Sequence, residues 1–274
     1  MGLRVNTNLF SLTAQNNLAN VSSRLGGNFA RLSSGLRIAA ASDDAAGLGI
    51  SERMRAQIRS LHQAGRNASD GISLVQTAEG SLGETSANLV RMRELAVQAS
   101  NGTLNSGDRA VLDAEFQDLL SEIDRVADQT TFNGVNLFDG STASLDLQVG
   151  TETGEIITIT LEDATSSGLG LSGGSFDITT ASNASAALDT IDSAIDTVSA
   201  FRGDLGGVQN RLDSVVRSIS NTAENLSGAE SRIRDVDIAL ETADLTRNTI
   251  LQQAALSVLA QANVQPQLAL SLLG

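Results

Sequence analysis

The chain lacks several residue types that most proteins of its length use. Its 274 residues include no cysteine, tryptophan, tyrosine or lysine, and only one proline and one histidine. Aromatic residues make up 3% of the chain, and all of them are phenylalanine. Compact cores of this size usually rely on aromatic side chains, because each one buries a large area. Few aromatics and a single proline are instead typical of long, uninterrupted helices that pack through aliphatic side chains.

The absence of cysteine excludes disulfide bonds, thiolate catalysis and cysteine-bound zinc or iron–sulfur clusters. It also suits a protein that moves between reducing and oxidising compartments. No apolar segment of a secretory signal peptide follows Met1, so we expect any export to use a route without a cleaved leader. Glutamine and asparagine interrupt the uncharged tract from Asn248 to Gly274, and we do not expect it to cross a membrane.

Negative charge is in excess. The chain has 32 acidic residues against 18 basic ones, all of them arginine, which gives a formal net charge of −14. An acidic surface repels phosphate groups, and this argues against nucleic acids and anionic membranes as partners.

The two chain ends carry complementary patterns. Residues 1–42 contain four arginines and no acid, whereas residues 235–274 contain four acids and one arginine. Apolar residues recur at steps of three or four, the period of a coiled-coil contact face, in both segments. The apolar positions that we expect to form assembly seams are Leu18, Val21, Leu25, Phe29, Leu32, Leu36, Val236, Leu240, Ile250 and Ala254. The two ends are therefore predicted to pair with each other.

The middle of the chain predicts further long helices and one hairpin. A strict seven-residue apolar repeat runs through about 44–100, and Ser42 is expected to cap that helix. Further helical patterns cover about 108–128 and about 185–234, the latter continuing into the tail with little sign of a stop. The period drops to two around 145–161, which indicates a β-hairpin in a region of about 140–180. The repeat positions are Met54, Leu61, Ala68, Val75, Leu82, Leu89 and Ala96.

These patterns predict a mainly α fold. We expect an elongated, antiparallel helical rod or coiled coil built from both chain ends, with a small β-hairpin region in the middle. The apolar faces at the two ends cannot be buried by either end alone, which favours a protein that assembles with partner helices.

No pattern supports catalysis. Residues 168–173 match G-x-G-x-x-G, but residues 175–179 do not begin a helix, as a dinucleotide site requires. Residues 170–174 match G-x-S-x-G, yet His62 is the only histidine and lies in a helical segment. No calcium-loop motif occurs, and the many carboxylates are spread over exposed helical positions. We therefore expect no enzyme activity, no metal and no cofactor.

Several ordered motifs resemble those of bacterial flagellin. Residues 32–38 (LSSGLRI) and 43–48 (DDAAGL) resemble its N-terminal motif, and residues 89–98 resemble its inner-domain helix. At the other end, residues 250–254 (ILQQA) and 257–263 (SVLAQAN) resemble its C-terminal motif. The resemblance covers nearly the whole chain and leaves no room for a long insert, as in a minimal flagellin without variable outer domains.

The resemblance implies a structural subunit of the flagellar filament that is exported unfolded by the flagellar type III apparatus, self-assembles outside the cell and serves motility. Residues 1–43 and 235–274 would form the terminal coiled-coil domain that lines the filament lumen, and residues 44–234 the inner rod domain. The implied partners are copies of the chain itself, the flagellar cap and hook–filament junction proteins, and an export chaperone at the C-terminal segment.

A recognition site is also implied by the resemblance alone. In the flagellin family, the flagellin-sensing Toll-like receptor of animals contacts the inner-domain helix. Arg91, Leu95 and Glu115 match the positions of that determinant. Core packing is the alternative role for Leu95, and filament contacts are the alternative for the two charged residues.

Other protein classes remain possible at this point. A hook–filament junction protein resembles flagellin at its ends, although the hairpin and the receptor-type helix favour flagellin. A secreted helical adaptor without a polymer is the remaining alternative. A flagellin with an enzymatic insert is excluded, because no H-E-x-x-H motif is present.

Overall fold

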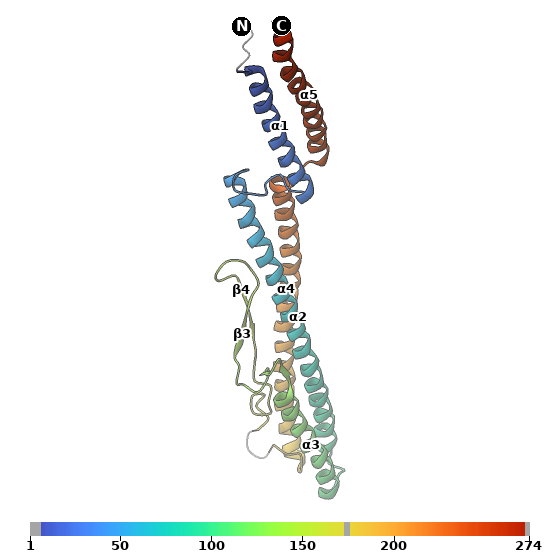
Figure 1. Ribbon diagram of the computed structural model, residues 1–274. Coiled ribbons are helices and arrows are strands. Elements are labelled where there is room, and N and C mark those ends of the chain that lie inside the picture. The colour runs from blue at the N-terminus through green and yellow to red at the C-terminus, as the bar shows by residue number, and fades with distance from the viewer. Residues whose placement is uncertain (1–6, 173–175, 272–274) are drawn as a thin grey trace. The chain divides into compact units, whose positions relative to one another are not determined.

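The computed structural model describes residues 7–172 and 176–271, with side chains described as far as residue 265. It divides into two compact units: one contains Met1–Ile58 and Glu224–Gly274, and the other Arg59–Ala223. Figure 1 labels the helices α1 to α5 and the strands β3 and β4. The predicted mainly α fold with a small β region is confirmed, since five long helices and two short hairpins make up the described part of the chain. The division at residues 43 and 235 stays a prediction, and the boundaries between the two compact units fall elsewhere, after residues 58 and 223.

The two chain ends pair as predicted. Helix α1 (Leu9–Ser34) packs against helix α5 (Ile238–Ser271). Helix α1 begins where the Asn8 side chain accepts a hydrogen bond from the backbone N–H of Ser11 at 3.1 Å. It ends at Gly35, whose φ of 71° lets its N–H bond to the carbonyl of Arg31 at 2.9 Å.

Helix α2 (Ala45–Ala99) starts later than expected, and the predicted cap at Ser42 is wrong. The carboxylate of Asp44 accepts from the N–H of Gly47 at 2.9 Å, so Asp44 is the capping residue. The neighbouring Asp43 instead accepts from the N–H groups of Ala39 and Ala40, and so holds the turn that precedes the helix.

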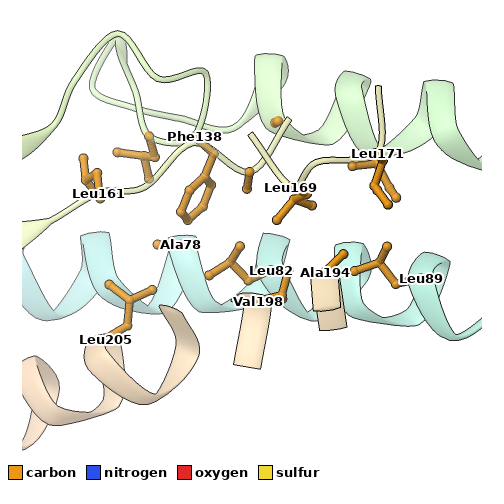
Figure 2. Packing of buried hydrophobic residues seen from close by; sticks show 14 of the residues in the cluster. Ala78, Leu82, Leu89, Phe138, Leu161, Leu169, Leu171, Ala194, Val198 and Leu205 are labelled. Atoms are coloured by element: carbon orange, nitrogen blue, oxygen red, sulfur yellow. The ribbon is translucent and has the colours of Figure 1, made fainter. Parts of the chain in front are cut away.

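The core of the Arg59–Ala223 unit lies between α2, α4 (Ala181–Arg234) and the chain segments that cover them (Figure 2). The seven-residue repeat predicted for α2 is confirmed from its second position onward. Buried residues on α4 follow the same repeat, so the two helices contribute matching apolar faces. The buried repeat residues are Leu61, Ala68, Val75, Leu82, Leu89 and Ala96 on α2, and Ile191, Val198, Leu205, Leu212 and Ile219 on α4.

Helix α3 (Ser106–Gln129) adds a further layer to this core. Its N-terminus carries a reciprocal capping box, in which the side chains of Asn105 and Asp108 each accept from the other residue's backbone N–H. Phe116 and Ile123 are fully buried, and the ring of Phe116 lies 5.3 Å from that of Phe176.

Two hairpins come after α3. Strands β1 (Thr131–Phe132) and β2 (Val135–Asn136) are joined by Asn133 and Gly134, both with positive φ, as a tight two-residue hairpin turn requires. The predicted longer hairpin is confirmed: β3 (Ser144–Gln148) pairs antiparallel with β4 (Ile156–Thr160). Its alternating apolar residues face the core, and Ile157 and Ile159 on β4 are buried.

The expectation that the last helix continues without a stop is wrong. Helix α4 begins four residues before the expected start and ends at Arg234, and α5 starts at Ile238. Two causes interrupt the helix. Residues 235–236 turn their backbone toward residues 35–36, and the carboxylate of Asp237 accepts from the N–H groups of Ala239 and Leu240, which caps a new helix.

Candidate assembly surface

Helices α1 and α5 meet along a heptad pattern that we call the terminal seam. Buried or half-buried positions recur with alternating steps of three and four on both helices, the spacing of a coiled coil. The terminal seam consists of Ser11, Ala14, Leu18, Val21, Leu25, Asn28 and Leu32 on α1, and Glu241, Leu245, Asn248, Gln252, Ala255, Leu259 and Ala262 on α5.

Only some of the predicted seam residues lie in the terminal seam. Leu25 is buried in the terminal seam, and the residues at 18, 21 and 32 are half-buried there. Phe29 is 60% exposed and lies off the seam, because Asn28 takes the heptad position beside it. Leu36 falls beyond the end of α1, and Val236 precedes α5. On α5, Leu240, Ile250 and Ala254 are exposed.

Large apolar side chains outside the terminal seam therefore remain uncovered around this helix pair. Among the side chains that the structure describes, seventeen large hydrophobic ones are exposed, and eleven of these lie on α1 and α5. Exposed apolar side chains that gather in this way mark interaction surfaces. We call this set the outer apolar face: Leu9, Phe10, Leu12, Phe29, Ile238, Leu240, Ile250, Leu251, Leu256, Val258 and Val264.

The outer apolar face is hollowed near the start of α1. A depression of about 690 Å³ lies between Phe10 and the stretch of α5 from Ser257 to Gln265. Val258 and Val264 line it together with the ring of Phe10.

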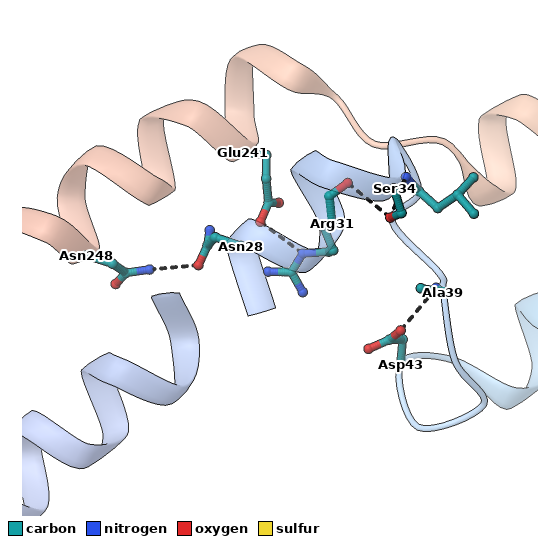
Figure 3. Close-up of polar contacts among 8 residues, drawn as sticks. Asn28, Arg31, Ser34, Ala39, Asp43, Glu241 and Asn248 are labelled. Carbon is teal, nitrogen blue, oxygen red and sulfur yellow. Dashed lines mark hydrogen bonds and ion pairs between the residues drawn. The ribbon is translucent and has the colours of Figure 1, made fainter. Parts of the chain in front are cut away.

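Four polar contacts join α1 and its capping residue to α5, and the sequence analysis named none of these pairs. Figure 3 shows two of them, Asn28 with Asn248 and Arg31 with Glu241. The side-chain amide of Asn248 donates to the amide oxygen of Asn28 at 3.1 Å. The Ser11 hydroxyl donates to Asn263 at 2.7 Å, and the Asn8 amide donates to the carbonyl of Ala262 at 2.7 Å. Arg31 and Glu241 form an ion pair at 2.9 Å, in keeping with the opposite charges of the two ends. The available signal was the heptad itself, which places Asn28 and Asn248 among apolar positions.

A short two-stranded contact joins the segments between the helices, and we call it the joint. The N–H of Arg37 donates to the carbonyl of Arg234 at 2.7 Å, and that of Val236 donates to the carbonyl of Gly35 at 3.0 Å. Arg234 is 8% exposed, and its guanidinium pairs with Glu52 at 2.6 Å. Ile38 is buried beside it, so the joint has a small core of its own.

The residues of the expected receptor site lie on α2 and α3. The guanidinium of Arg91 contacts Glu115 at 2.8 Å and Glu94 at 2.9 Å. Its hydrogen bonds, first to Glu115 and then to Glu94, raise the pKa of the Arg91 guanidinium. Both Arg91 and Glu115 are about half exposed, whereas Leu95 is only 1% exposed. The two charged residues are thus brought together at the surface, and Leu95 lies in the core.

Residues 168–172 of the glycine-rich stretch 168–174 form turns, and Leu169 and Leu171 among them are buried in the core, as Figure 2 shows. Its last two residues lie outside the described part of the chain. Within the described residues, no three potential metal-binding side chains gather, and His62 is exposed on α2. None of the described helices has the length and apolar character needed to cross a membrane.

Comparisons with known proteins agree with this arrangement. The sequence matches the family model of the bacterial flagellin N-terminal helical region over residues 5–143 and that of the C-terminal helical region over residues 188–273. The chain belongs to the bacterial flagellin family. It is 49% identical to the flagellin of Halalkalibacterium halodurans over 269 residues, which cover 98% of this chain and 99% of that protein. The flagellin of Bacillus subtilis is 44% identical over 303 residues, covering 99% of this chain and all of that protein.

Solved structures support the same fold. The crystal structure of Bacillus cereus flagellin is 31% identical, with a TM-score of 0.52 over 60% of this chain and 94% of that chain. A putative flagellar hook-associated protein from Vibrio parahaemolyticus shares the fold, with a TM-score of 0.59 at 18% identity over 70% of this chain and all of that chain.

Membership of this family establishes the general function. Like other flagellins, this flagellin is a structural subunit that self-assembles into the filament, and it is not an enzyme. The end-to-end match with relatives of similar length means that it has no large variable domain. A hook–filament junction protein is not favoured, because the full-length relatives named above are flagellins.

Proposed function

We propose that the outer apolar face of α1 and α5 is the surface through which flagellin subunits join in the filament. The observation that carries this proposal is the concentration of exposed large hydrophobic side chains on these two helices. The terminal seam already buries one face of each helix, so the outer face is left to contacts between molecules. Burial of apolar area is the main favourable term in protein association.

In this proposal the chain ends and the middle of the chain form two domains with different roles. We assign residues 1–43 and 235–274 to the terminal coiled-coil domain that lines the lumen, and residues 44–234 to the inner rod domain. The pairing of α1 with α5 supports the first assignment. Subunits packed closely around a narrow lumen need apolar contacts on more than one side of each helix pair, and α5 offers such side chains over most of its length.

The route to the filament is part of the proposal. The chain is secreted unfolded through the flagellar type III apparatus and added beneath the flagellar cap, next to earlier subunits and to hook–filament junction proteins. An export chaperone would cover the C-terminal segment, whose exposed apolar residues need protection before assembly. A chain without cysteine cannot form wrong disulfides on entering an oxidising medium.

A substitution on the outer apolar face tests the proposal. Ile250→Asp places a charge on an apolar side chain that is 61% exposed, so it leaves the terminal seam intact. Val111→Asp, at a residue of α3 that is 72% exposed, is the matched control. Each full-length variant is heated to give monomers, then cooled with seeds, and filaments are counted by electron microscopy.

We expect Ile250→Asp to abolish long filaments while the far-ultraviolet circular dichroism of the monomer is unchanged, because an unpaired charge is costly to bury between subunits. Val111→Asp should polymerise normally. Normal filaments from Ile250→Asp would contradict the proposal, as would an equal loss in both variants.

We further propose that the flagellin-sensing Toll-like receptor reads Arg91 and Glu115 as one charged pair, with Leu95 holding the helix surface in place from below. The half-exposed ion pair and the burial of Leu95 support this assignment. A cell assay of receptor activation should show a clear loss for Arg91→Ala. The control is Arg93→Ala, which removes a neighbouring ion pair with Asp192. Equal signals from both variants would refute a specific role for Arg91.

A further inference from the structure

The terminal seam has a property that its apolar residues cannot explain. A strict heptad repeat looks the same after a shift of seven residues, so apolar side chains alone allow several registers of α1 against α5. Each such shift moves one helix along the other by about 10 Å, at a rise of about 1.5 Å per residue. A single register therefore requires residues that break the repeat.

We propose that Asn28 and Asn248 are positioning residues that fix the register of α1 against α5. Asn28 is 2% exposed, and its amide oxygen accepts from Asn248 at 3.1 Å within an otherwise largely apolar seam. The two residues form the only contact between seam positions in which both side chains are amides, among the residues that the structure describes. A buried polar residue at one core position of a coiled coil is known to select register at some cost in stability.

Each of the two neighbouring registers places a different residue opposite Asn28 and loses a native polar contact. If α5 shifts by one heptad in one direction, Asn28 faces Ala255 in place of Asn248. In the other direction it faces Glu241, which would have to move about 10 Å along α1 from its ion pair with Arg31. The first shift leaves a buried amide without its partner, and such a loss costs more than the hydrogen bond contributes. A second polar contact, from Ser11 to Asn263 at the far end of the seam, selects the same register.

The register matters for assembly because it aligns the outer apolar face. Exposed apolar residues lie on both helices, such as Phe29 on α1 and Ile250 on α5, and a displacement of about 10 Å would change how the two sets line up toward a neighbouring subunit. This consequence rests on the proposed function, whereas the role of the two asparagines in setting the register does not.

Engineered cysteines can report the register, because the natural chain has none. Ala14 and Ala262 lie two heptads from Asn28 and Asn248 on their respective helices, and both are buried. A shifted seam would instead bring residue 14 opposite 255, or residue 21 opposite 262. The three reporter pairs are therefore cysteines at 14 and 262, at 14 and 255, and at 21 and 262. Disulfides form only where the Cα atoms come within about 7 Å.

Each reporter pair is placed in the full-length chain, which is oxidised under assembly conditions and analysed by mass spectrometry. With the natural asparagines we expect only the 14–262 disulfide. In Asn28→Leu/Asn248→Leu we expect the shifted disulfides in about a tenth or more of the chains, as for a second state of similar free energy. The control Leu18→Ile/Leu245→Ile, used with all three reporters, changes apolar seam residues and should keep the native disulfide alone.

A variant with the α1 asparagine at another heptad position gives a second test if Asn28→Leu/Asn248→Leu does not assemble. Val21→Asn/Asn28→Leu with Asn248 retained moves the amide of α1 by one heptad, and should favour the 14–255 disulfide. The native disulfide alone in both asparagine variants would overturn the proposal, because the pair would then only add stability. Shifted disulfides in the control would overturn it too. The 14–262 disulfide alone in Ile250→Asp chains that form no filaments would show that the register does not depend on the outer apolar face.

Discussion

Leu36 and Asp235 form an antiparallel backbone bridge that joins the segment after α1 to the segment before α5. The bridge forms because both helices stop there: Gly35 ends α1 in the left-handed conformation, and α4 ends at Arg234. Hydrogen bonds on either side of the bridge, from Arg37 to Arg234 and from Val236 to Gly35, satisfy backbone groups that the helix ends leave unpaired. The joint thus depends on a small number of backbone positions.

Gly35→Ala should weaken the joint. A side chain at a φ of 71° is strained, and we expect the free energy of unfolding to fall by about 1 kcal/mol after the gain in unfolded-state entropy is counted. Gly26→Ala, in the body of α1 with open space around it, should instead stabilise the chain by about 0.5–1 kcal/mol. Thermal unfolding of both variants compares them. Equal midpoints would show that the left-handed cap contributes nothing.

Leu95→Ala should lower stability, because Leu95 is buried between helices. We expect a loss of about 2–5 kcal/mol in the free energy of unfolding, as for other large-to-small core substitutions. Val97→Ala, on the same helix and 50% exposed, should change it by less than about 1 kcal/mol. Urea titration measures both. A reduced receptor response of Leu95→Ala that persists without any loss of stability would instead make Leu95 a direct contact.

Two glycines of α2 should respond oppositely to alanine. At Gly71 a methyl group would lie 2.2 Å from Leu147 of β3, whereas at Gly80 nothing lies within 4 Å. Gly80→Ala should stabilise the helix by about 1 kcal/mol. Gly71→Ala should be less stable than Gly80→Ala by about 1–3 kcal/mol, because the Leu147 side chain must leave its present position. Similar stabilities in denaturant titrations would mean that β3 does not pack closely on α2.

The turn that precedes α2 should be sensitive to acid through Asp43. Hydrogen bonds from the N–H groups of Ala40 and Ala39 hold the pKa of the Asp43 carboxyl below its ordinary value of 3.8. Its contribution to stability is therefore present above about pH 3.8 and is lost as the pH falls below that value. The difference in thermal midpoint between the natural chain and Asp43→Asn should shrink between about pH 5 and pH 2.5. A constant difference would show that the ionised carboxylate has no role.

Much of the helical core could be predicted from the sequence. The seven-residue repeat of α2 and the alternation at β3 and β4 are signals that each element carries within itself, and both proved correct. The capping residue could not be chosen between Ser42 and Asp44, because several side chains in that stretch can accept from a helix N-terminus.

The assembly surface was harder to predict for a physical reason. Periodicity shows that α1 and α5 are apolar, but both helices are apolar on more than one face, so the pattern does not say which face meets which partner. Phe29 and Leu240 were grouped with Leu25, although only Leu25 is buried in the terminal seam. The polar pair at Asn28 was missed because asparagine does not contribute to an apolar repeat.

The most direct measurement is a high-resolution reconstruction of the filament by electron cryomicroscopy, since it shows which side chains subunits bury. The account predicts that Phe29, Leu240 and Ile250, each at least 60% exposed in the single chain, lie buried against neighbouring subunits. Filaments in which these three side chains face solvent would contradict it.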